Sequence, residues 1–353
     1  MFLIIIDVGR VSRGLGVNHQ FSQRLGSDTE QSHAIQCPRL ILYRGFSGQR
    51  HYSKNQKHSF LVDGATALCH HPEIDFASRK GKKPISLRIS ILASGSSGNI
   101  TLLETERTRL LVDAGLGKRE TLARLAALNI TVESLDGILI THEHADHCNG
   151  LPQMLGLWKA PLFVTEPTMD ALQRCLPETF GKRLRGVETI HAGQRFTIGD
   201  IDVHAFAIPH DAADPLGFTF KSNGAKMALV TDLGYLPELV KVHLRDADCL
   251  LLESNHDLDM LKVGPYPWVV KQRVLSRTGH LSNHAVSEYL SDPDGFDALA
   301  RFLILAHVSL ENNNPDVVRI SAEEALGRRP AERAFSGQLL IADQRTPLAS
   351  LQL

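Results

Sequence analysis

Short apolar runs bounded by Gly, Asp, Asn or Ser dominate the chain from Leu87 onward. These runs predict strands at residues 87–93, 99–105, 108–115, 135–141, 161–165, 201–208, 216–222, 225–232, 247–254 and 300–307. Helices are predicted at residues 118–128, 235–244, 266–276, 282–291 and 314–326. Because strands and helices mix without strict alternation, the pattern predicts a layered α/β domain with sheets inside and helices outside.

Residues 1–85 have a different character. They show little sustained hydrophobic period, are rich in Ser, Gln, Arg and Gly, and end near the linker-like stretch RKGKKP. We therefore expect a poorly ordered extension over 1–85 and one domain over 86–353. No methionine lies between the first residue and Met154, so a shorter natural product would need another initiator codon, with Val62 or Leu87 as candidates.

The composition limits the class of protein but does not indicate a function. Hydrophobic residues at 43% and charged residues at 22% are ordinary for a globular protein, and the net charge of −1 means that a charged partner must be met by a local patch. The 5 cysteines form no C-x-x-C pair, which argues against a disulfide framework and a cysteine-rich zinc site. No apolar run approaches the length of a membrane span. A reducing cytoplasm is the expected location.

The candidate chemistry begins in the stretch ILITHEHADHCNG. His142 and His144 stand two residues apart after a predicted strand, so an extended chain directs both to the same side. Asp146 and His147 follow where the loop enters a helix. Imidazole suits Zn, Mn or Fe, and a carboxylate adds an oxygen ligand that can be shared with a second ion. The arrangement predicts a metal site rather than a solvated His-rich loop.

Further ligands are needed to complete two metal sites. His210, Asp232 and His307 each stand at the end of a predicted strand. Taken alone, a strand-end His or Asp is as often a capping or core residue as a ligand. Together, the three deliver the ligand types that the first motif lacks, which favours ligation.

The motif THEHADH, followed by these three strand-end residues, resembles the metallo-β-lactamase superfamily. The resemblance covers residues 87–326 and implies an αββα sandwich with a dinuclear metal site at the edges of its two sheets. Smaller signatures closely resemble the YycJ/WalJ group, which is implicated in 5′ exonuclease activity on DNA. They are LASGSSGN, VDAG, IPHDAADP, ESNHD, GHLSN and LAHVSLENN.

The resemblance also implies a ligand set for two divalent ions, with Zn and Mn both open as identities. The implied ligands are His142, His144 and His210 for site one, Asp146, His147 and His307 for site two, and Asp232 as the bridge. Some lactamases of the superfamily use a cysteine ligand, which this sequence lacks at the matching places. Cys148 is therefore read as incidental, and a β-lactam substrate is disfavoured.

Catalytic roles follow from a second resemblance, to the tRNA 3′-processing nucleases of the superfamily. His280 in GHLSN and Glu253 in ESNHD match a histidine and a glutamate that handle protons at the leaving oxygen. We expect His280 to be the proton donor and Glu253 to hold its tautomer, with Asp146 as a third catalytic residue. The alternative for His280 is a structural role at the entry to a helix.

Substrate contacts are weaker predictions. The loop ASGSSGN offers Ser96, Ser97 and Asn99 as an anion-binding nest, or equally as an ordinary turn. Lys271, Arg273 and Arg277 precede His280 and are candidate phosphate contacts. Asn283 is a further candidate substrate-binding residue. Two aromatic side chains, Tyr266 and Trp268, could stack on a base, although core packing is the favoured expectation.

These observations lead to a dinuclear metal-dependent phosphodiesterase, expected to be a 5′-to-3′ DNA exonuclease in which a metal-bridged hydroxide attacks phosphorus. DNA is favoured over RNA, no membrane partner is expected, and the oligomeric state stays open. One alternative is a small-molecule hydrolase of the same superfamily acting on a thioester, lactone or cyclic phosphodiester. A second is a non-enzymatic binding protein, which the complete ligand set disfavours because buried ligands without chemistry are costly.

Overall fold

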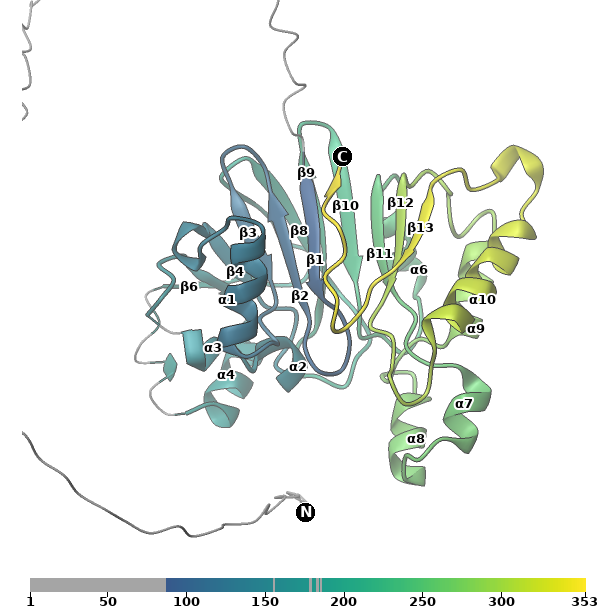
Figure 1. The fold of residues 1–353 in the computed structure, drawn as a ribbon, viewed down its shortest axis with the longest axis horizontal. Helices are drawn as coiled ribbons and strands as arrows, with labels where there is room; N and C mark the ends of the chain where they lie inside the picture. Colours follow the sequence, from purple (N-terminus) through teal and green to yellow (C-terminus); the bar gives the residue numbers. More distant parts are fainter. Residues whose placement is uncertain (1–86, 155, 178–179, 182–183, 185) are drawn as a thin grey trace, which may run out of the picture. The chain divides into compact units, whose positions relative to one another are not determined.

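The structure is a computed structural model that describes residues 87–353 except 155, 178–179, 182–183 and 185. The expected extension over residues 1–85 lies outside the described residues. In the described part, two sheets lie face to face, with helices on their outer faces (Figure 1). The predicted layered α/β fold and its αββα form are confirmed.

The first sheet has seven strands in the order β14-β1-β2-β3-β4-β5-β6. Strands β1 to β3 pair antiparallel, and β3 to β6 pair parallel. The strands are β1 (Arg88–Ala93), β2 (Ile100–Glu104), β3 (Arg109–Val112), β4 (Gly137–Leu139), β5 (Leu162–Val164), β6 (Val187–Thr189) and β14 (Leu351–Gln352). The last strand pairs antiparallel with β1, so the end of the chain completes the edge of this sheet.

The second sheet also has seven strands, in the order β13-β12-β11-β10-β9-β8-β7. Strands β7 to β10 pair antiparallel, and β10 to β13 pair parallel. The strands are β7 (Arg195–Ile198), β8 (Ile201–Ala207), β9 (Leu216–Ser222), β10 (Ala225–Val230), β11 (Cys249–Glu253), β12 (Phe302–Ala306) and β13 (Gln338–Ile341).

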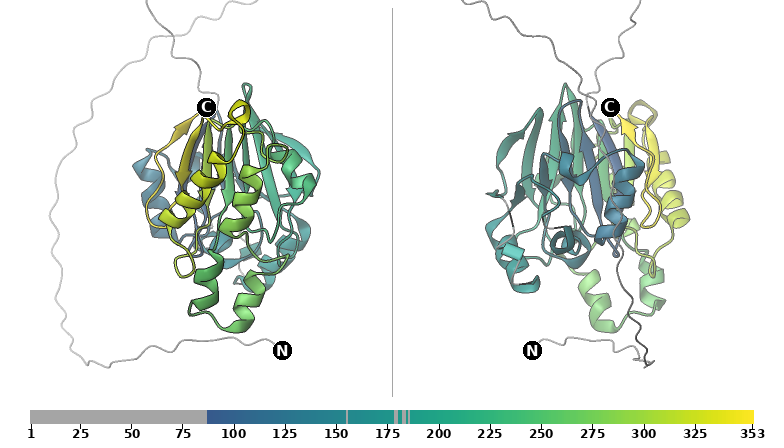
Figure 2. Two further views of the ribbon diagram at one scale, coloured as in Figure 1. Left: turned by 90° about the vertical axis from the view of Figure 1, so that its right-hand side faces the viewer. Right: turned by 60° about the vertical axis from the view of Figure 1, so that its left-hand side comes forward.

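Helices cover the outer faces of both sheets (Figure 2). The first sheet packs on α1 (Lys118–Ala127) and α4 (Glu166–Cys175), and the second on α6 (Glu238–Leu244), α9 (Asn283–Ser291) and α10 (Pro315–Gly327). Other helices with fully described bounds are α2 (Ala145–Cys148), α3 (Leu151–Met154), α7 (Leu258–Val263), α8 (Trp268–Val274) and the short 3-10 turns Val132–Ser134 and Ala331–Arg333. Among the described residues, no helix is long and apolar enough to cross a membrane.

The central strands are apolar on both faces because the middle of each sheet is buried on both sides. In β10, Met227 and Leu229 belong to the core between the sheets, whereas Ala228 and Val230 belong to the core under the outer helices. This double burial explains why the sequence shows continuous apolar runs instead of strict alternation.

Several elements were not predicted from the sequence, namely β6, β7, β13, β14, α3, α4 and α7. The patterns of the missed strands are weak for a physical reason: β6 is exposed at every position, and β13 is only partly buried. An edge strand that packs on one neighbour carries little apolar signal. The omission left the closing strands of both sheets unassigned.

Three strand ends carry non-glycine residues with left-handed backbone. Asp113 follows β3 with φ of 62°, Asp232 follows β10 with φ of 63°, and His307 follows β12 with φ of 55°. Such conformations cost free energy and persist where the surrounding structure fixes them, commonly at functional sites. All three residues are buried. The fold therefore holds strain at these strand ends.

Candidate metal centre

The predicted ligands come from four loops at one edge of the sandwich. His142, His144, Asp146 and His147 follow β4 and enter α2, while His210 follows β8. Asp232 and His307 follow β10 and β12, which belong to the same sheet as β8. The backbone at Gly115 packs closely against the first of these loops. A Cβ atom on Gly115 would lie 1.7 Å from the backbone oxygen of Asp146, so only glycine fits there.

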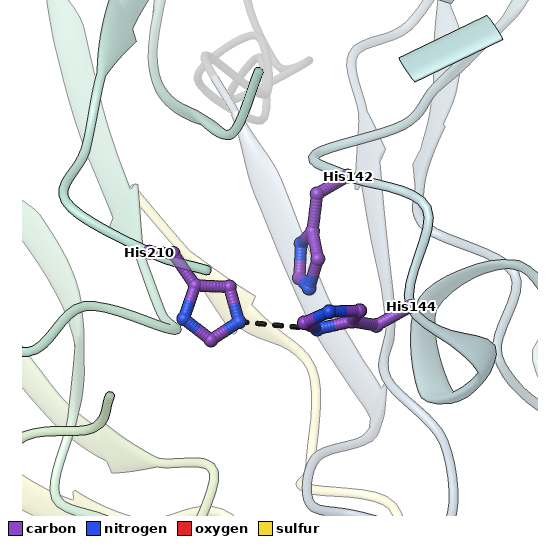
Figure 3. Close-up of side chains that lie close together, drawn as sticks. All are labelled: His142, His144 and His210. Carbon is purple, nitrogen blue, oxygen red and sulfur yellow. Dashed lines mark hydrogen bonds between the residues drawn. The ribbon is translucent and has the colours of Figure 1, made fainter. Parts of the chain in front are cut away.

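The first group of ligand atoms consists of three histidines, His142, His144 and His210, whose rings converge from separate loops (Figure 3). One nitrogen from each lies within 4.8 Å of the others, and His210 Nε2 is 3.1 Å from His144 Nδ1. The opposite nitrogen of His210 faces the backbone oxygens of Thr278 and Gly279 at 3.1 and 3.2 Å. That contact orients the ring so that Nε2 points into the cluster.

The second group combines two carboxylates with two imidazoles. Asp146, His147, Asp232 and His307 form it, with potential ligand atoms within 4.8 Å of one another. His147 Nε2 lies 3.2 Å from Asp232 Oδ2 and 3.4 Å from Asp146 Oδ2. His307 Nε2 lies 3.2 Å from Asp146 Oδ2. Asp232 also lies 4.0 Å from His210 of the first group, so it stands between the two groups.

The donor atoms fit divalent metal ions. His142 is fully buried, yet its Nε2 atom has no hydrogen-bond partner among the described residues, which is rare for a buried polar atom unless an ion or water completes it. Burial lowers the pKa of His142 well below its usual value, and burial also lowers the pKa of His210. Both rings are thus held neutral, the form that binds metal.

A third group places Glu253 and His280 against the second. It contains Asp232, Glu253, His280 and His307, and Glu253 Oε1 lies 2.9 Å from His280 Nδ1 and 2.7 Å from His307 Nδ1. Burial raises the pKa of Glu253, but His280 and the hydrogen bonds from both histidines outweigh it and hold the pKa at about 2. Burial lowers the pKa of His280, and Glu253 more than reverses this. His280 therefore has a carboxylate that stabilises its protonated form.

Asp113 is a site residue that the sequence reasoning missed. Its Oδ2 atom lies 2.8 Å from His147 Nδ1, and its Oδ1 atom accepts a hydrogen bond from the backbone N–H of Thr141 at 2.9 Å. The available signal was a strand-end aspartate in VDAG, the same signal that marked Asp232. Asp113 orients the ring of the candidate ligand His147 through the nitrogen that faces away from the cluster.

Replacing Asp113 by Asn is expected to weaken metal binding by about 10–100-fold, because His147 loses the carboxylate that fixes its tautomer. Asparagine tolerates the left-handed backbone at this position, so the fold should remain. Competition between the protein and a chromogenic chelator for Zn²⁺ or Mn²⁺ measures the change. Unchanged affinity in a folded variant would contradict a supporting role for Asp113.

Two of the residues predicted in the loop after β1 remain at the surface. Ser96 and Ser97 are exposed, whereas Asn99 is buried. The side-chain nitrogen Nδ2 of Asn99 lies 3.1 Å from Asp146 Oδ2 and 3.0 Å from His147 Nε2. Its position suits support of the candidate metal ligands. The Ser97 hydroxyl already contacts the side-chain amide of Gln344 at 3.0 Å, so the geometry gives its predicted anion contact no support.

The other predicted substrate-binding residues differ in their exposure and in the partners of their side chains. Asn283 is 3% exposed, and its amide is engaged by Ser254 and Asn313, so the geometry gives its predicted contact no support. Lys271 and Arg273 lie on α8. Arg273 pairs with both carboxylate oxygens of Asp211, and Lys271 Nζ donates to a backbone oxygen at 2.7 Å.

Cys148 follows the ligand motif without joining the cluster. Its sulfur is directed at the backbone oxygens of Glu143 and His144, at 3.0 and 3.1 Å. Burial raises the pKa of Cys148 to about 12. The residue is therefore a protonated thiol, in line with its reading as incidental.

Comparisons with known proteins agree with this geometry. A family model described as the beta-lactamase superfamily domain matches residues 108–307. The chain is 37% identical over 244 residues to the exodeoxyribonuclease YycJ of Bacillus anthracis, covering 69% of this chain and 90% of that one. It is 37% identical over 252 residues to the exodeoxyribonuclease WalJ of Streptococcus pneumoniae serotype 2, with the same two coverages of 69% and 90%. The structure of the metallo-beta-lactamase fold protein YhfI from Bacillus subtilis matches with a TM-score of 0.58 at 17% identity, covering 76% of this chain and 100% of that one, and supports the fold alone.

Proposed function

Because the chain belongs to the metallo-β-lactamase superfamily, and within it to the YycJ/WalJ group, we propose that it is a metal-dependent exonuclease that degrades DNA from 5′ ends in the 5′-to-3′ direction. The observation that carries the proposal is the Glu253–His280 pair. A histidine held at 2.9 Å by a buried carboxylate stands beside the candidate ligand Asp232, where a proton donor for a phosphodiester is needed. The names of the two relatives favour DNA over RNA.

The donor groups suit two divalent ions, Zn or Mn. His142, His144 and His210 would hold the first ion, and Asp146, His147 and His307 the second, with Asp232 shared between them. When bound, two such ions supply an activated hydroxide and neutralise charge on the phosphoryl oxygens. The buried carboxylates of the second group balance part of the added positive charge.

The protein's own residues handle the leaving group. Because Nδ1 of His280 faces Glu253, its Nε2 atom is the nitrogen free to meet substrate. We propose that Nε2–H donates a proton to the departing 3′ oxygen as the P–O bond breaks. A positioned acid of this kind contributes roughly 10²–10⁴-fold to the rate. Glu253 fixes the tautomer and stabilises the charged ring, and so acts as a positioning residue.

The test is digestion of DNA and RNA labelled at the 5′ or the 3′ end, by protein loaded with Mn²⁺ or Zn²⁺. We expect stepwise loss from the 5′ end of DNA, and no cleavage after the metal is removed with a chelator. Turnover of a model phosphodiester or thioester without cleavage of any polymer would overturn the exonuclease and leave the small-molecule hydrolase.

A cytoplasmic setting is part of the same proposal. Within the described part of the chain, Cys148, Cys175 and Cys249 are free thiols. Free thiols of this kind are typical of reducing compartments. Thiol labelling of the protein in intact cells would test the setting, since disulfide formation in vivo would contradict it.

A further inference from the structure

The segment 257–277, which we call the α7–α8 arm, extends beyond the strand ends on the side where α2 lies (Figure 1; Figure 2). It exposes large apolar side chains: Val263 is 87% exposed, Trp268 67% and Val269 75%. The expectation that Trp268 packs in the core is therefore wrong. Because α8 lies beyond the strand ends and not on the face of a sheet, this indole has no sheet on which to pack (Figure 1).

The C-terminal end of α8 is fixed to the loops of the candidate metal centre. Arg273 on α8 pairs with Asp211, the neighbour of the candidate ligand His210. The backbone N–H of His280 donates to the backbone oxygen of Val274, the last residue of α8, at 3.0 Å. Gly279 permits this approach, because a Cβ atom there would lie 2.2 Å from the same oxygen. The exposed residues of the arm are thus held at a set distance from the proposed proton donor.

The length of α8 suits contact with a polynucleotide strand. Val274 follows Trp268 by six positions along the helix, a rise of about 9 Å. Successive nucleotides of a stacked strand are about 3.4 Å apart, so the helix spans roughly three nucleotides. Val269 lies one turn before Arg273 on the same helix face, which is the face that reaches the Asp211 loop. One exposed apolar residue of the arm therefore shares a helix face with the contact to the loop of the candidate metal centre.

The charge of the arm also suits a strand. Its four basic residues are Lys262, Lys271, Arg273 and Arg277, and its two acidic residues, Asp257 and Asp259, both lie at the start of α7. Lys262 pairs with Asp259, and Arg273 pairs with Asp211 outside the arm, so Lys271 and Arg277 carry the local positive charge. Cationic side chains beside an exposed aromatic ring are a usual means of binding a single strand without sequence preference.

We propose that the α7–α8 arm binds a single-stranded segment of the nucleic acid substrate, with Trp268 stacking on a base and Lys271 contacting phosphate. This inference rests on the proposed nuclease function, and it assigns the contacts a few nucleotides from the scissile bond. A second copy of the chain is the other conceivable occupant of the apolar face, and the test below separates the two.

Intrinsic fluorescence gives a direct test, because the chain has two tryptophans and Trp158 is only 3% exposed. Metal-loaded protein is titrated with single-stranded oligothymidine that carries phosphorothioate linkages at its 5′ end to resist cleavage. Stacking is expected to quench the Trp268 emission, and the quenching should be absent from Trp268→Phe.

Affinity for the same oligonucleotide and KM for cleavage of single-stranded DNA are then compared among variants. Trp268→Ala is expected to weaken binding and raise KM by about 10-fold or more, while Trp268→Phe keeps most of the affinity. The matched control is Leu299→Ala, because Leu299 is 65% exposed but precedes β12, whose other end carries His307. This control should bind and cleave as the parent does.

Each outcome decides the inference. Suppose that DNA is cleaved normally, that the oligonucleotide does not quench the fluorescence, and that KM is unchanged in Trp268→Ala. The proposed role of the arm is then wrong, and the proposed nuclease function stands. If no polymer is cleaved but a model phosphodiester is hydrolysed, the proposed function fails. Quenching of Trp268 by the oligonucleotide would then still support strand binding by the arm, and no quenching would overturn it. If sedimentation shows that Trp268→Ala dissociates a dimer and oligonucleotide affinity is unchanged, the face is a contact between copies and the inference is overturned.

Discussion

Replacing Asp232 by Asn is expected to lower kcat/KM for DNA cleavage by about 10³-fold or more. Loss of a group behind a ligand typically costs about 10–100-fold, and Asp232 stands among the candidate ligands themselves. It belongs to both groups that contain carboxylates and lies 4.0 Å from His210 of the remaining one. The variant should bind less metal, as measured by metal analysis after dialysis, and kinetics on end-labelled DNA measure the activity.

A matched control is available for this substitution. Asp246 also has left-handed backbone, with φ of 56°, but it is exposed in the turn before β11. Asp246→Asn repeats the chemical change and the backbone demand away from the ligands, so metal content and activity should remain near the parent values. Full activity of Asp232→Asn with its full complement of metal would refute the bridging assignment.

The positions of the candidate ligands could be predicted because their signal is local. His142 and His144 share a side of an extended segment, and Asp232 and His307 directly follow buried strands, so the apolar runs themselves indicate where the polar residues emerge. The sandwich then brings the strand ends to one edge, which is why residues distant in sequence converge. The resemblance supplied the pairing of ligands into sites.

The remaining features depend on tertiary context that no local pattern records. Asn283 stands next to GHLS in sequence, but its amide is turned into a buried network with Ser254 and Asn313. Trp268 carries the apolar character of a core residue, and only its place on a projecting helix makes it a surface residue. Asp113 had the same strand-end signal as Asp232, yet its role appears only once His147 is placed beside it.

Replacing His280 by Ala is expected to lower kcat for DNA by about 10²–10⁴-fold, because the departing 3′ oxygen then leaves without a proton. A p-nitrophenyl phosphodiester has a leaving group that needs no proton, so its hydrolysis should fall by less than about 10-fold. Comparing the two substrates in the same metal-loaded preparation measures the dependence on the leaving group. Metal content should stay near that of the parent, since His280 is outside the proposed ligand set.

His284→Ala is the matched control, because His284 lies on the next helix with its side chain 67% exposed and contacts Glu288 at 3.3 Å. It should cleave both substrates at the parent rates. Glu253→Gln should show the His280→Ala preference for the p-nitrophenyl substrate in weaker form, because the imidazole remains but loses the carboxylate that holds its Nδ1 atom at 2.9 Å. Equal losses on both substrates in His280→Ala would instead mean that His280 supports the fold or the metal ligands, and the proton donor would have to be sought elsewhere.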